Sequence, residues 1–306
     1  MDLVISALAF ILVLLVAGNS LAICVGTVIS SSIIKRRSAL LIAIVGYVLG
    51  LVTQGSLLGY GFSAIMPQPS YLDISTALFI GTLIFIISHK FRVSQSLSIT
   101  FATSLIGISL ASGQMINFGF VALMIALWIM APAASLILAE FAMKATPMLL
   151  QKKKVWETLA WIRLLLVILS FFTAFTLGAN TLGLLFASVK TYTSIFVVII
   201  AIIVGSLVMG RGEIRRLGND ILPLRYINAI VSQAISVGFA EGATVAGVPL
   251  SNTPTFTASI YGTGLAYKTS LFIKKTRNIF LMTWIATAFV SLFLGYGITW
   301  LVLYLH

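Results

Sequence analysis

The sequence predicts an all-α polytopic membrane protein, made of two inverted-topology repeats of about five transmembrane segments each, with broken helices or hairpins at mid-membrane. Of its 306 residues, 60% are hydrophobic and 8% are charged, a more apolar balance than a soluble domain needs. Long apolar runs recur from one end of the chain to the other, as membrane-spanning helices do. Small polar motifs also recur at matching positions in the two halves, a pattern typical of transporters built from repeats.

Ten apolar segments divide evenly between the two halves. Because these runs are continuous rather than alternating, they indicate helices and not the strands of a β-barrel. The lysine run 152–154 separates the halves, so we expect a first transmembrane repeat over 1–142, a cytoplasmic basic loop over 143–155 and a second, inverted repeat over 156–306. The predicted segments are 3–34, 38–61, 74–88, 93–112 and 116–142, then 156–189, 191–210, 226–240, 251–267 and 278–304.

Basic residues gather in alternate loops, which predicts how the chain is threaded through the membrane. The loop with Lys35, Arg36 and Arg37 corresponds to a second-half loop with Lys190 alone, whereas the basic loop after segment 191–210 corresponds to a first-half loop without basic residues. Cytoplasmic loops carry the excess of Lys and Arg, so a single threading with inverted repeats satisfies both. It places the two termini outside the plasma membrane. The net charge of +12 then reflects topology rather than binding to nucleic acid.

An asparagine motif lies within the first segment of each repeat. Asn19-Ser20 and Asn180-Thr181 each follow small residues, and the two asparagines are 161 residues apart. The 32 residues of segment 3–34 would form about 48 Å of helix, against an apolar core of about 30 Å. We therefore expect each segment to break at its motif, because irregular backbone at this depth is tolerated where it lines a cavity. All four residues are predicted to line the functional site.

A polar cluster opens the fourth segment of each repeat. Ser96 and Ser98 begin one segment, and Ser251, Asn252 and Thr253 begin the other. The N–H groups and the dipole of a helix start favour a bound anion. We therefore expect these residues to bind an oxyanion substrate without a buried Lys or Arg. For any single hydroxyl, the alternative is an ordinary hydrogen bond between membrane helices.

The residue types that enzymes and metal sites need are scarce. His89 and His306 are the two histidines and lie far apart, and Cys24 is the one cysteine. No Ser/His/Asp set can be assembled, and no glycine-rich phosphate loop with its lysine is present. Thiolate metal clusters are excluded by the cysteine count. We expect a protein that is not an enzyme, with no catalytic residue, no metal site and no cofactor.

The paired motifs resemble the signatures of the inorganic phosphate transporter family, known as PiT. The stretch 17–27 is similar to its Gly-Ala-Asn-Asp signature, 177–181 to the second copy of that signature, and 249–254 to its Pro-Val-Ser-Thr-Thr-His signature. The resemblance covers nearly the whole chain. It implies a secondary transporter that moves phosphate or a related oxyanion with Na⁺ or H⁺ and binds the anion at the paired motifs near mid-membrane.

The sequence departs from the family pattern at acidic positions. The signature Asp is Ser20 in the first copy and Thr181 in the second, and family Glu residues fall at Gln233 and Tyr47. Because carboxylates are the usual strong ligands of hard cations, the resemblance leaves open whether Na⁺ couples transport. For coupling to Na⁺ or H⁺ we consider Gln233 and the surviving carboxylate of Glu241.

We expect a permease for inorganic phosphate or a related oxyanion that works by alternating access. Two alternatives stay open: a sulfate permease of the same fold, because no acceptor carboxylate selects against sulfate, and an uncoupled anion facilitator. A membrane scaffold without transport is a further possibility. Expected partners are the anion and membrane lipid, and a homo-oligomer is possible.

Overall fold

The computed structural model describes residues 2–30, 34–91, 95–150, 155–208, 226–266 and 273–305. All regular elements in these ranges are helical, which confirms the all-α prediction. In the first half they are α1 (Leu3–Ser30), α2 (Arg36–Gln54), η1 (Gly55–Leu57), α3 (Leu58–Ile65), α4 (Tyr71–Phe91), α5 (Leu97–Ala111) and α6 (Phe118–Leu150). In the second half they are α7 (Val155–Thr176), η2 (Leu177–Leu182), α8 (Gly183–Val189), α9 (Ile195–Val208), α11 (Tyr226–Val245), α12 (Asn252–Leu265) and α13 (Ile273–Leu305).

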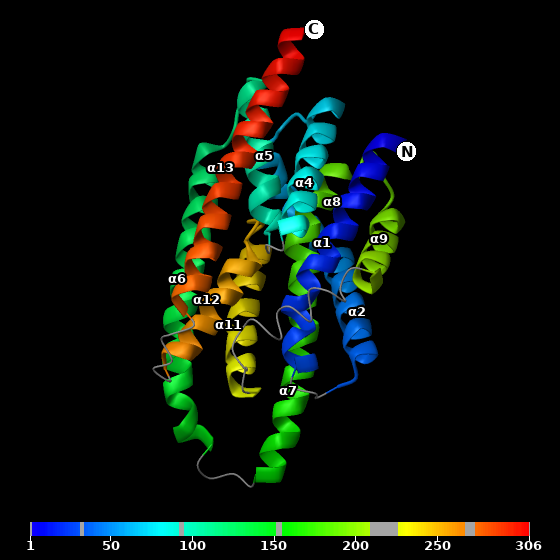
Figure 1. Ribbon diagram of the computed structural model, residues 1–306. Helices are drawn as coiled ribbons and strands as arrows, with labels where there is room; N and C mark the ends of the chain where they lie inside the picture. Colours follow the sequence, from blue (N-terminus) through cyan, green and yellow to red (C-terminus); the bar gives the residue numbers. More distant parts are fainter. Residues whose placement is uncertain are drawn as a thin grey trace.

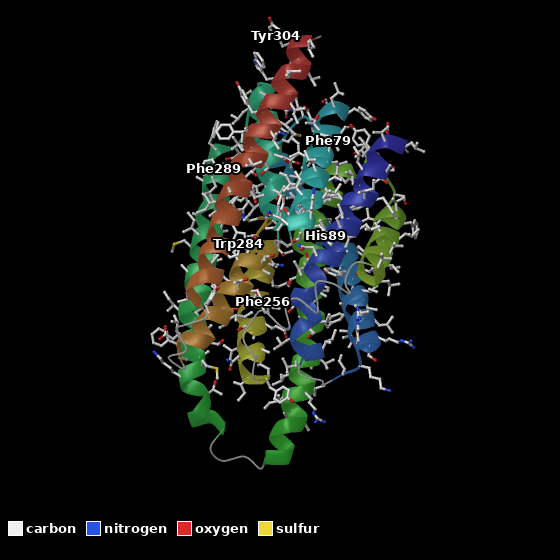
Figure 2. All side chains as sticks on the ribbon, viewed as in Figure 1. Phe79, His89, Phe256, Trp284, Phe289 and Tyr304 are labelled. Atoms are coloured by element: carbon white, nitrogen blue, oxygen red, sulfur yellow. The ribbon has the colours of Figure 1, made fainter. Side chains whose placement is uncertain are left out.

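Six stretches of helix within the described ranges are long and apolar enough to cross a membrane. Helices α5 and α9 are apolar but shorter. Large apolar side chains cover the outside of the bundle, as at Phe79, Phe289 and Tyr304 (Figure 2). The chain is therefore an integral membrane protein. The six stretches are Leu3–Gly26, Arg36–Ile65, Tyr71–Phe91, Phe118–Thr146, Ala160–Val189 and Trp284–Leu305.

Two helical hairpins enter the bundle from opposite ends. Helices α4 and α5 form one in the upper half of Figure 1, and α11 and α12 form the other in the lower half. The ends of α4 and α11 and the starts of α5 and α12 lie near the middle of the bundle (Figure 1). Polar residues at the turns make this possible, because backbone that ends inside a membrane needs hydrogen-bond partners there. The structure therefore shows hairpins that end inside the bundle, and their depth in the membrane stays a prediction.

Helices of the two halves pack in exchanged pairs: α1 on α9 and α7 on α2, then α5 on α13 and α12 on α6. Glycines allow the closest approaches. A Cβ atom on Gly107 would lie 2.1 Å from the carbonyl oxygen of Leu292, and one on Gly262 would lie 2.1 Å from that of Leu136. The two glycines are 155 residues apart, the same offset as Ser96 and Ser251. Small residues at such contacts are typical of packed membrane helices.

The asparagine motifs do not break their helices. Helix α1 runs without interruption from Leu3 to Ser30, so the predicted break at Asn19 is wrong. At Asn180 the helix also continues, but η2 (Leu177–Leu182) is a π-helical turn between α7 and α8. A π turn widens a helix without ending it, and such turns are frequent at functional sites. The small residues of the second motif therefore distort the helix rather than interrupt it.

Both termini lie at the same end of the bundle, and α6 and α7 reach the opposite end (Figure 1). Helix occupies most of the range 143–155, because α6 extends to Leu150 and α7 begins at Val155. The lysine run 152–154 and the arginine-rich segment after α9 lie outside the described residues. The division into two repeats and their inverted orientation stay predictions, in agreement with the exchanged contacts between the halves.

Candidate functional site

The two hairpins touch at their turns. Ser96 is the N-cap residue of α5 and Ser251 is the N-cap residue of α12. The Ser251 hydroxyl donates a hydrogen bond to the Ser96 hydroxyl across 2.6 Å. Both serines are buried. Two helix N-termini, from distant parts of the chain, therefore meet inside the bundle.

Each helix start presents donors toward this meeting point. The first N–H groups of a helix have no partner within it, and the helix dipole adds about half a positive charge there. In α5, Ser96 Oγ accepts one of these groups, the N–H of Ile99. In α12, Pro254 in the first turn has no N–H to donate. The remaining backbone N–H groups of the two first turns belong to residues such as Ser98 and Thr253, both of which are predicted site residues.

The two motif asparagines hold the hairpin turns at equivalent points. Asn19 Nδ2 donates to the carbonyl oxygen of Gln95 across 3.1 Å. Asn180 Oδ1 accepts the N–H of Leu250 at 2.8 Å, and its Nδ2 donates to the carbonyl oxygen of Val248 at 3.0 Å. Gln95 and Leu250 directly precede the two N-cap serines. The asparagines thus act mainly through the backbone of the turns.

Further contacts join the two halves next to the hairpin turns. The hydroxyls of Ser98 and Thr181 are 3.3 Å apart, within hydrogen-bonding distance. Thr181 belongs to the π turn η2, so the distortion of that helix brings its hydroxyl to α5. Thr244 on α11 is a third partner of Asn180, at 3.1 Å from Nδ2. The structure therefore brings together Ser96, Ser98, Asn180, Thr181 and Ser251, as the sequence predicts.

Asn252 is the least satisfied residue of the site. It follows Ser251 in the first turn of α12, and 4% of its surface is exposed. Neither its Nδ2 nor its Oδ1 has a hydrogen-bond partner among the described residues. A buried amide without partners costs free energy unless a ligand or water completes its bonds. Thr253 comes next in the same turn and is also buried.

Ser20 and Gln233 lie in a different group of side chains. Tyr47 accepts a hydrogen bond from the Ser20 side chain and one from Cys24 Sγ, the latter at 3.6 Å. Gln233 Nε2 donates to the carbonyl oxygen of Cys24 at 3.1 Å and to the Ser170 hydroxyl at 3.5 Å. This group consists of neutral side chains. Ser20, predicted as a substrate ligand, is engaged there rather than at the hairpin turns.

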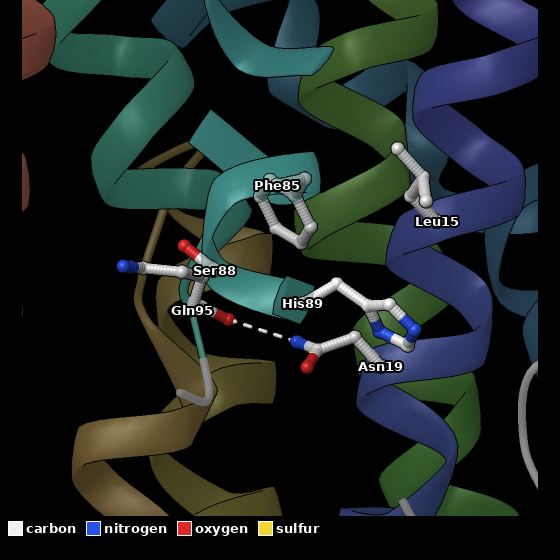
Figure 3. Close-up of a pocket in the computed structure, with 6 residues that line it drawn as sticks. All are labelled: Leu15, Asn19, Phe85, Ser88, His89 and Gln95. Carbon is white, nitrogen blue, oxygen red and sulfur yellow. Dashed lines mark hydrogen bonds between the residues drawn. The ribbon is translucent and has the colours of Figure 1, made fainter. Parts of the chain in front are cut away.

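A small pocket opens beside the turn between α4 and α5. It is lined by Asn19, Ser88, His89 and Gln95, with apolar walls from Leu15 and Phe85 (Figure 3). His89 is exposed and lies about half-way along the bundle (Figure 2). The pocket therefore gives access from outside the bundle to the bond between Asn19 and Gln95.

Two charged side chains of the described residues lie nearest the hairpin turns: Lys90, exposed at the end of α4, and Glu241 on α11. Glu241, predicted as a coupling residue, lies on α11 one turn before Thr244, and its Oε1 accepts a hydrogen bond from Gln54 Nε2 at 2.6 Å. Within the described part of the chain, no three His, Cys, Asp or Glu side chains gather as metal ligands. Arg163 is exposed. At the helix starts themselves, the described groups that could bind an anion are hydroxyls, amides and helix dipoles.

Sequence reasoning missed the residues that position the site. Gln95, Thr244 and Gln54 each hydrogen-bond a predicted residue. Gln95 could have been found, because it directly precedes Ser96 in the polar cluster. Thr244 and Gln54 carry no such signal, since their partners are 64 and 187 residues away in the chain.

Comparison with known proteins finds similar sequences and a similar fold among proteins described as phosphate transporters. The model of the Phosphate transporter family matches residues 150–295. A putative phosphate permease of Methanocaldococcus jannaschii is 25% identical over 291 residues, which cover 94% of each chain. The solved structure of a sodium-dependent phosphate transporter superposes with a TM-score of 0.78, at 14% identity, over 98% of each chain. The predicted resemblance to the inorganic phosphate transporter family is confirmed.

Proposed function

We propose that this chain, which resembles phosphate transporters over nearly its whole length, is a permease that moves inorganic phosphate across a membrane. The observation that carries the proposal is the meeting of two helix N-termini at Ser96 and Ser251, beside the unpaired amide of Asn252. Helix N-termini bind phosphate through their free N–H groups and dipole. Two of them, facing each other, supply positive potential from both sides without a buried cation.

The amide of Asn252 favours phosphate over sulfate. Inorganic phosphate keeps at least one O–H group at neutral pH, whereas sulfate has none. An asparagine side chain can donate through Nδ2 and accept through Oδ1, so Asn252 can bind a phosphate oxygen and a phosphate O–H at once. Sulfate would leave the buried Oδ1 without a partner, which costs about 1–3 kcal/mol. This supports phosphate as the substrate, with sulfate as the competing oxyanion.

The direct bond between Ser96 and Ser251 suggests how access alternates. An anion between the two turns would break this bond, and each serine hydroxyl would then donate to an oxygen of the anion. The hairpins come from opposite ends of the bundle (Figure 1), so movement of either would open the site toward one side only. Alternating access by movement of one repeat against the other follows the pattern of transporters with a mid-membrane site.

The proposed orientation puts both termini outside the plasma membrane. The start of α2, with Lys35, Arg36 and Arg37, lies at the end of the bundle opposite the termini, whereas the turn between α8 and α9, beside the N-terminus, has Lys190 as its one basic residue. Cytoplasmic segments carry the excess of Lys and Arg. The basic end would therefore face the cytoplasm, where anionic lipid headgroups attract such residues.

The coupling ion is proposed to be Na⁺ or H⁺. The solved structure matched here is described as sodium-dependent, while the group around Ser20, Tyr47 and Gln233 is neutral. Neutral oxygens bind a hard cation less strongly than carboxylates do. An uncoupled facilitator is the competing mechanism.

Uptake by the purified protein in liposomes tests the proposed function. The wild-type protein should take up labelled phosphate, and excess sulfate should compete weakly. Asn252→Leu should slow phosphate uptake and remove the preference over sulfate. Asn228→Leu is the matched control. Among the described residues, the Oδ1 of Asn228 also has no partner, but Asn228 lies near the start of α11, far from the turn that joins α11 to α12.

Two results would contradict the proposal. Wild-type liposomes that take up neither anion would exclude transport of these substrates. An unchanged preference in Asn252→Leu would exclude Asn252 as the selective group. Accumulation of phosphate above the outside concentration, driven by a Na⁺ or pH gradient, would exclude the uncoupled facilitator.

A further inference from the structure

One hydrogen bond inside the bundle has an unsatisfied acceptor on each side. Gln54 Nε2 donates to Glu241 Oε1 across 2.6 Å. The other oxygens of the two groups, Gln54 Oε1 and Glu241 Oε2, are both buried and have no hydrogen-bond partner among the residues that the structure describes. Both are acceptors when the carboxylate is ionised. An amide oxygen and a carboxylate oxygen both only accept, so neither can supply the hydrogen that the other needs.

The pair lies at the middle of the bundle, not at a membrane face. Glu241 is one helical turn before Thr244, whose hydroxyl binds Asn180. Gln54 ends α2 and is followed by Gly55, which packs against Gly183 just after the π turn η2. Through these neighbours, Thr244 and Gly55, the pair is linked to the helix that carries Asn180, so it is placed to respond when the turn held by Asn180 moves. Ionisable residues at such depth are generally functional.

No other charged group among the described residues satisfies Glu241. Glu140 is paired with Lys144, and the three arginines of these elements are exposed. Tyr47 is bonded to Cys24. The other titratable or charged side chains described near Glu241 belong to α11 and to the elements around it, α6, α7, α12, η2 and α2. They are Tyr226 on α11, Glu140 and Lys144 on α6, Arg163 on α7, Tyr261 on α12, and Arg36, Arg37 and Tyr47 on α2; η2 contributes none.

We infer that Glu241 and Gln54 form a proton-binding site. A proton added to Glu241 Oε2 makes a carboxylic acid, whose O–H donates to Gln54 Oε1. The acid and the amide then exchange two hydrogen bonds, N–H to Oε1 and O–H to Oε1, and both buried acceptors are satisfied. Loss of the proton to water restores the carboxylate and the single bond from Gln54.

The same atoms fit a metal cation poorly. Hard divalent cations take about six or more oxygen ligands, and the described residues offer two unsatisfied oxygens here. A single proton would give both of these oxygens a hydrogen bond. This inference rests on the proposed function in one respect, since the proton would be the ion whose gradient drives phosphate uptake.

Infrared difference spectroscopy of the purified protein tests the site without transport. Lowering the pH should produce carboxylic acid C=O bands in the wild-type protein and in Glu140→Gln, which removes a half-buried carboxylate paired with Lys144. One component of these bands, present in both of those proteins, should be absent in Glu241→Gln. If every component persists unchanged in Glu241→Gln, the inference is overturned.

Transport assays test whether this proton drives uptake. Wild-type liposomes should accumulate phosphate when the outside is acidic. Glu241→Gln keeps an amide in place of the protonated acid, so it should exchange phosphate across the membrane but lose accumulation driven by the pH gradient. Accumulation by Glu241→Gln equal to that of Glu140→Gln would overturn the role in coupling. If the wild-type protein exchanges no phosphate, the proposed function fails, while the infrared band still decides the proton site.

Gln54→Leu provides a second variant in case Glu241→Gln does not fold. Without the amide of Gln54, the acid loses both of its hydrogen bonds. The C=O band should therefore shift toward the frequency of a free carboxylic acid. A band at the wild-type frequency would show that Gln54 is not the partner and would overturn the site.

Discussion

The hydroxyl of Ser251 donates to the hydroxyl of Ser96 across 2.6 Å, and this bond joins the turns of two hairpins that enter the bundle from opposite ends. Both residues are N-caps, so the bond also sets two helix dipoles against each other. Like ends of dipoles repel, and an anion between them would relieve that repulsion. In the proposed function, this contact is the closed form of the oxyanion site.

The two turns should be open to crosslinking. In a Cys24→Ala background, Ser96→Cys with Ser251→Cys should form a disulfide under mild oxidation, because the two side chains already touch and a disulfide needs close Cβ atoms. Oxidation should stop phosphate uptake, and reduction should restore it. Each single cysteine variant, treated in the same way, is the control. Full uptake by the crosslinked protein would mean that the turns need not separate.

Ser251→Ala should weaken phosphate binding. A hydrogen bond to a charged group contributes about 1.5–3 kcal/mol, so the dissociation constant should rise about tenfold to a hundredfold. Titration calorimetry or equilibrium binding of labelled phosphate measures this. Ser188→Ala is the control, because its hydroxyl donates within its own helix to the carbonyl of Leu185; equal losses in both variants would contradict the site.

Asn180→Leu should destabilise the protein more than Asn19→Leu. Asn180 is fully buried and binds Leu250, Val248 and Thr244, whereas Asn19 is half-buried and its described bond is to Gln95. Each buried group that loses its partner costs about 1–3 kcal/mol. Thermal unfolding in detergent should show the larger fall in midpoint for Asn180→Leu. The reverse order would mean that the first turn depends more on its asparagine.

Gly107→Ala and Gly262→Ala should both loosen the contact between the halves. The added Cβ would meet a backbone carbonyl oxygen, that of Leu292 or Leu136, at 2.1 Å, and such overpacking costs about 1–3 kcal/mol. Gly59→Ala is the control, since its Cβ would meet nothing within 4 Å. The thermal midpoint of each variant checks this; a large difference between the first two would argue against equivalent roles in the two halves.

Glu241 shows why sequence position alone misplaces a residue. It comes four residues before the end of α11, and a helix end in a membrane protein is normally read as a membrane face. The α11–α12 turn instead lies against Asn180, so this helix end is in the middle of the bundle. The contact with Gln54 joins residues 187 positions apart and has no signature along the chain.

The continuous α1 is the clearest failure of the local reading. A segment of 32 residues with Gly18 and Asn19 in its middle suggested a break, because a straight helix of that length exceeds the apolar core. A helix can also tilt or extend beyond the core, and α1 keeps its backbone hydrogen bonds throughout. In the second copy, the same type of motif makes a π turn. Local sequence did not distinguish the two outcomes.

The sequence by itself determined the helical membrane class, and it predicted two related halves and the residues that gather at Ser96 and Ser251. These follow from the apolar composition, from polar residues repeated at offsets of 155 and 161, and from the chemistry of helix starts, all of which are local properties. Only the tertiary structure decided that the fourth segments begin inside the bundle, that Ser20 joins Tyr47 rather than the hairpin turns, and that Glu241 meets Gln54. These depend on packing between distant segments, where close contact at glycines such as Gly107 and Gly262 fixes which side chains can meet.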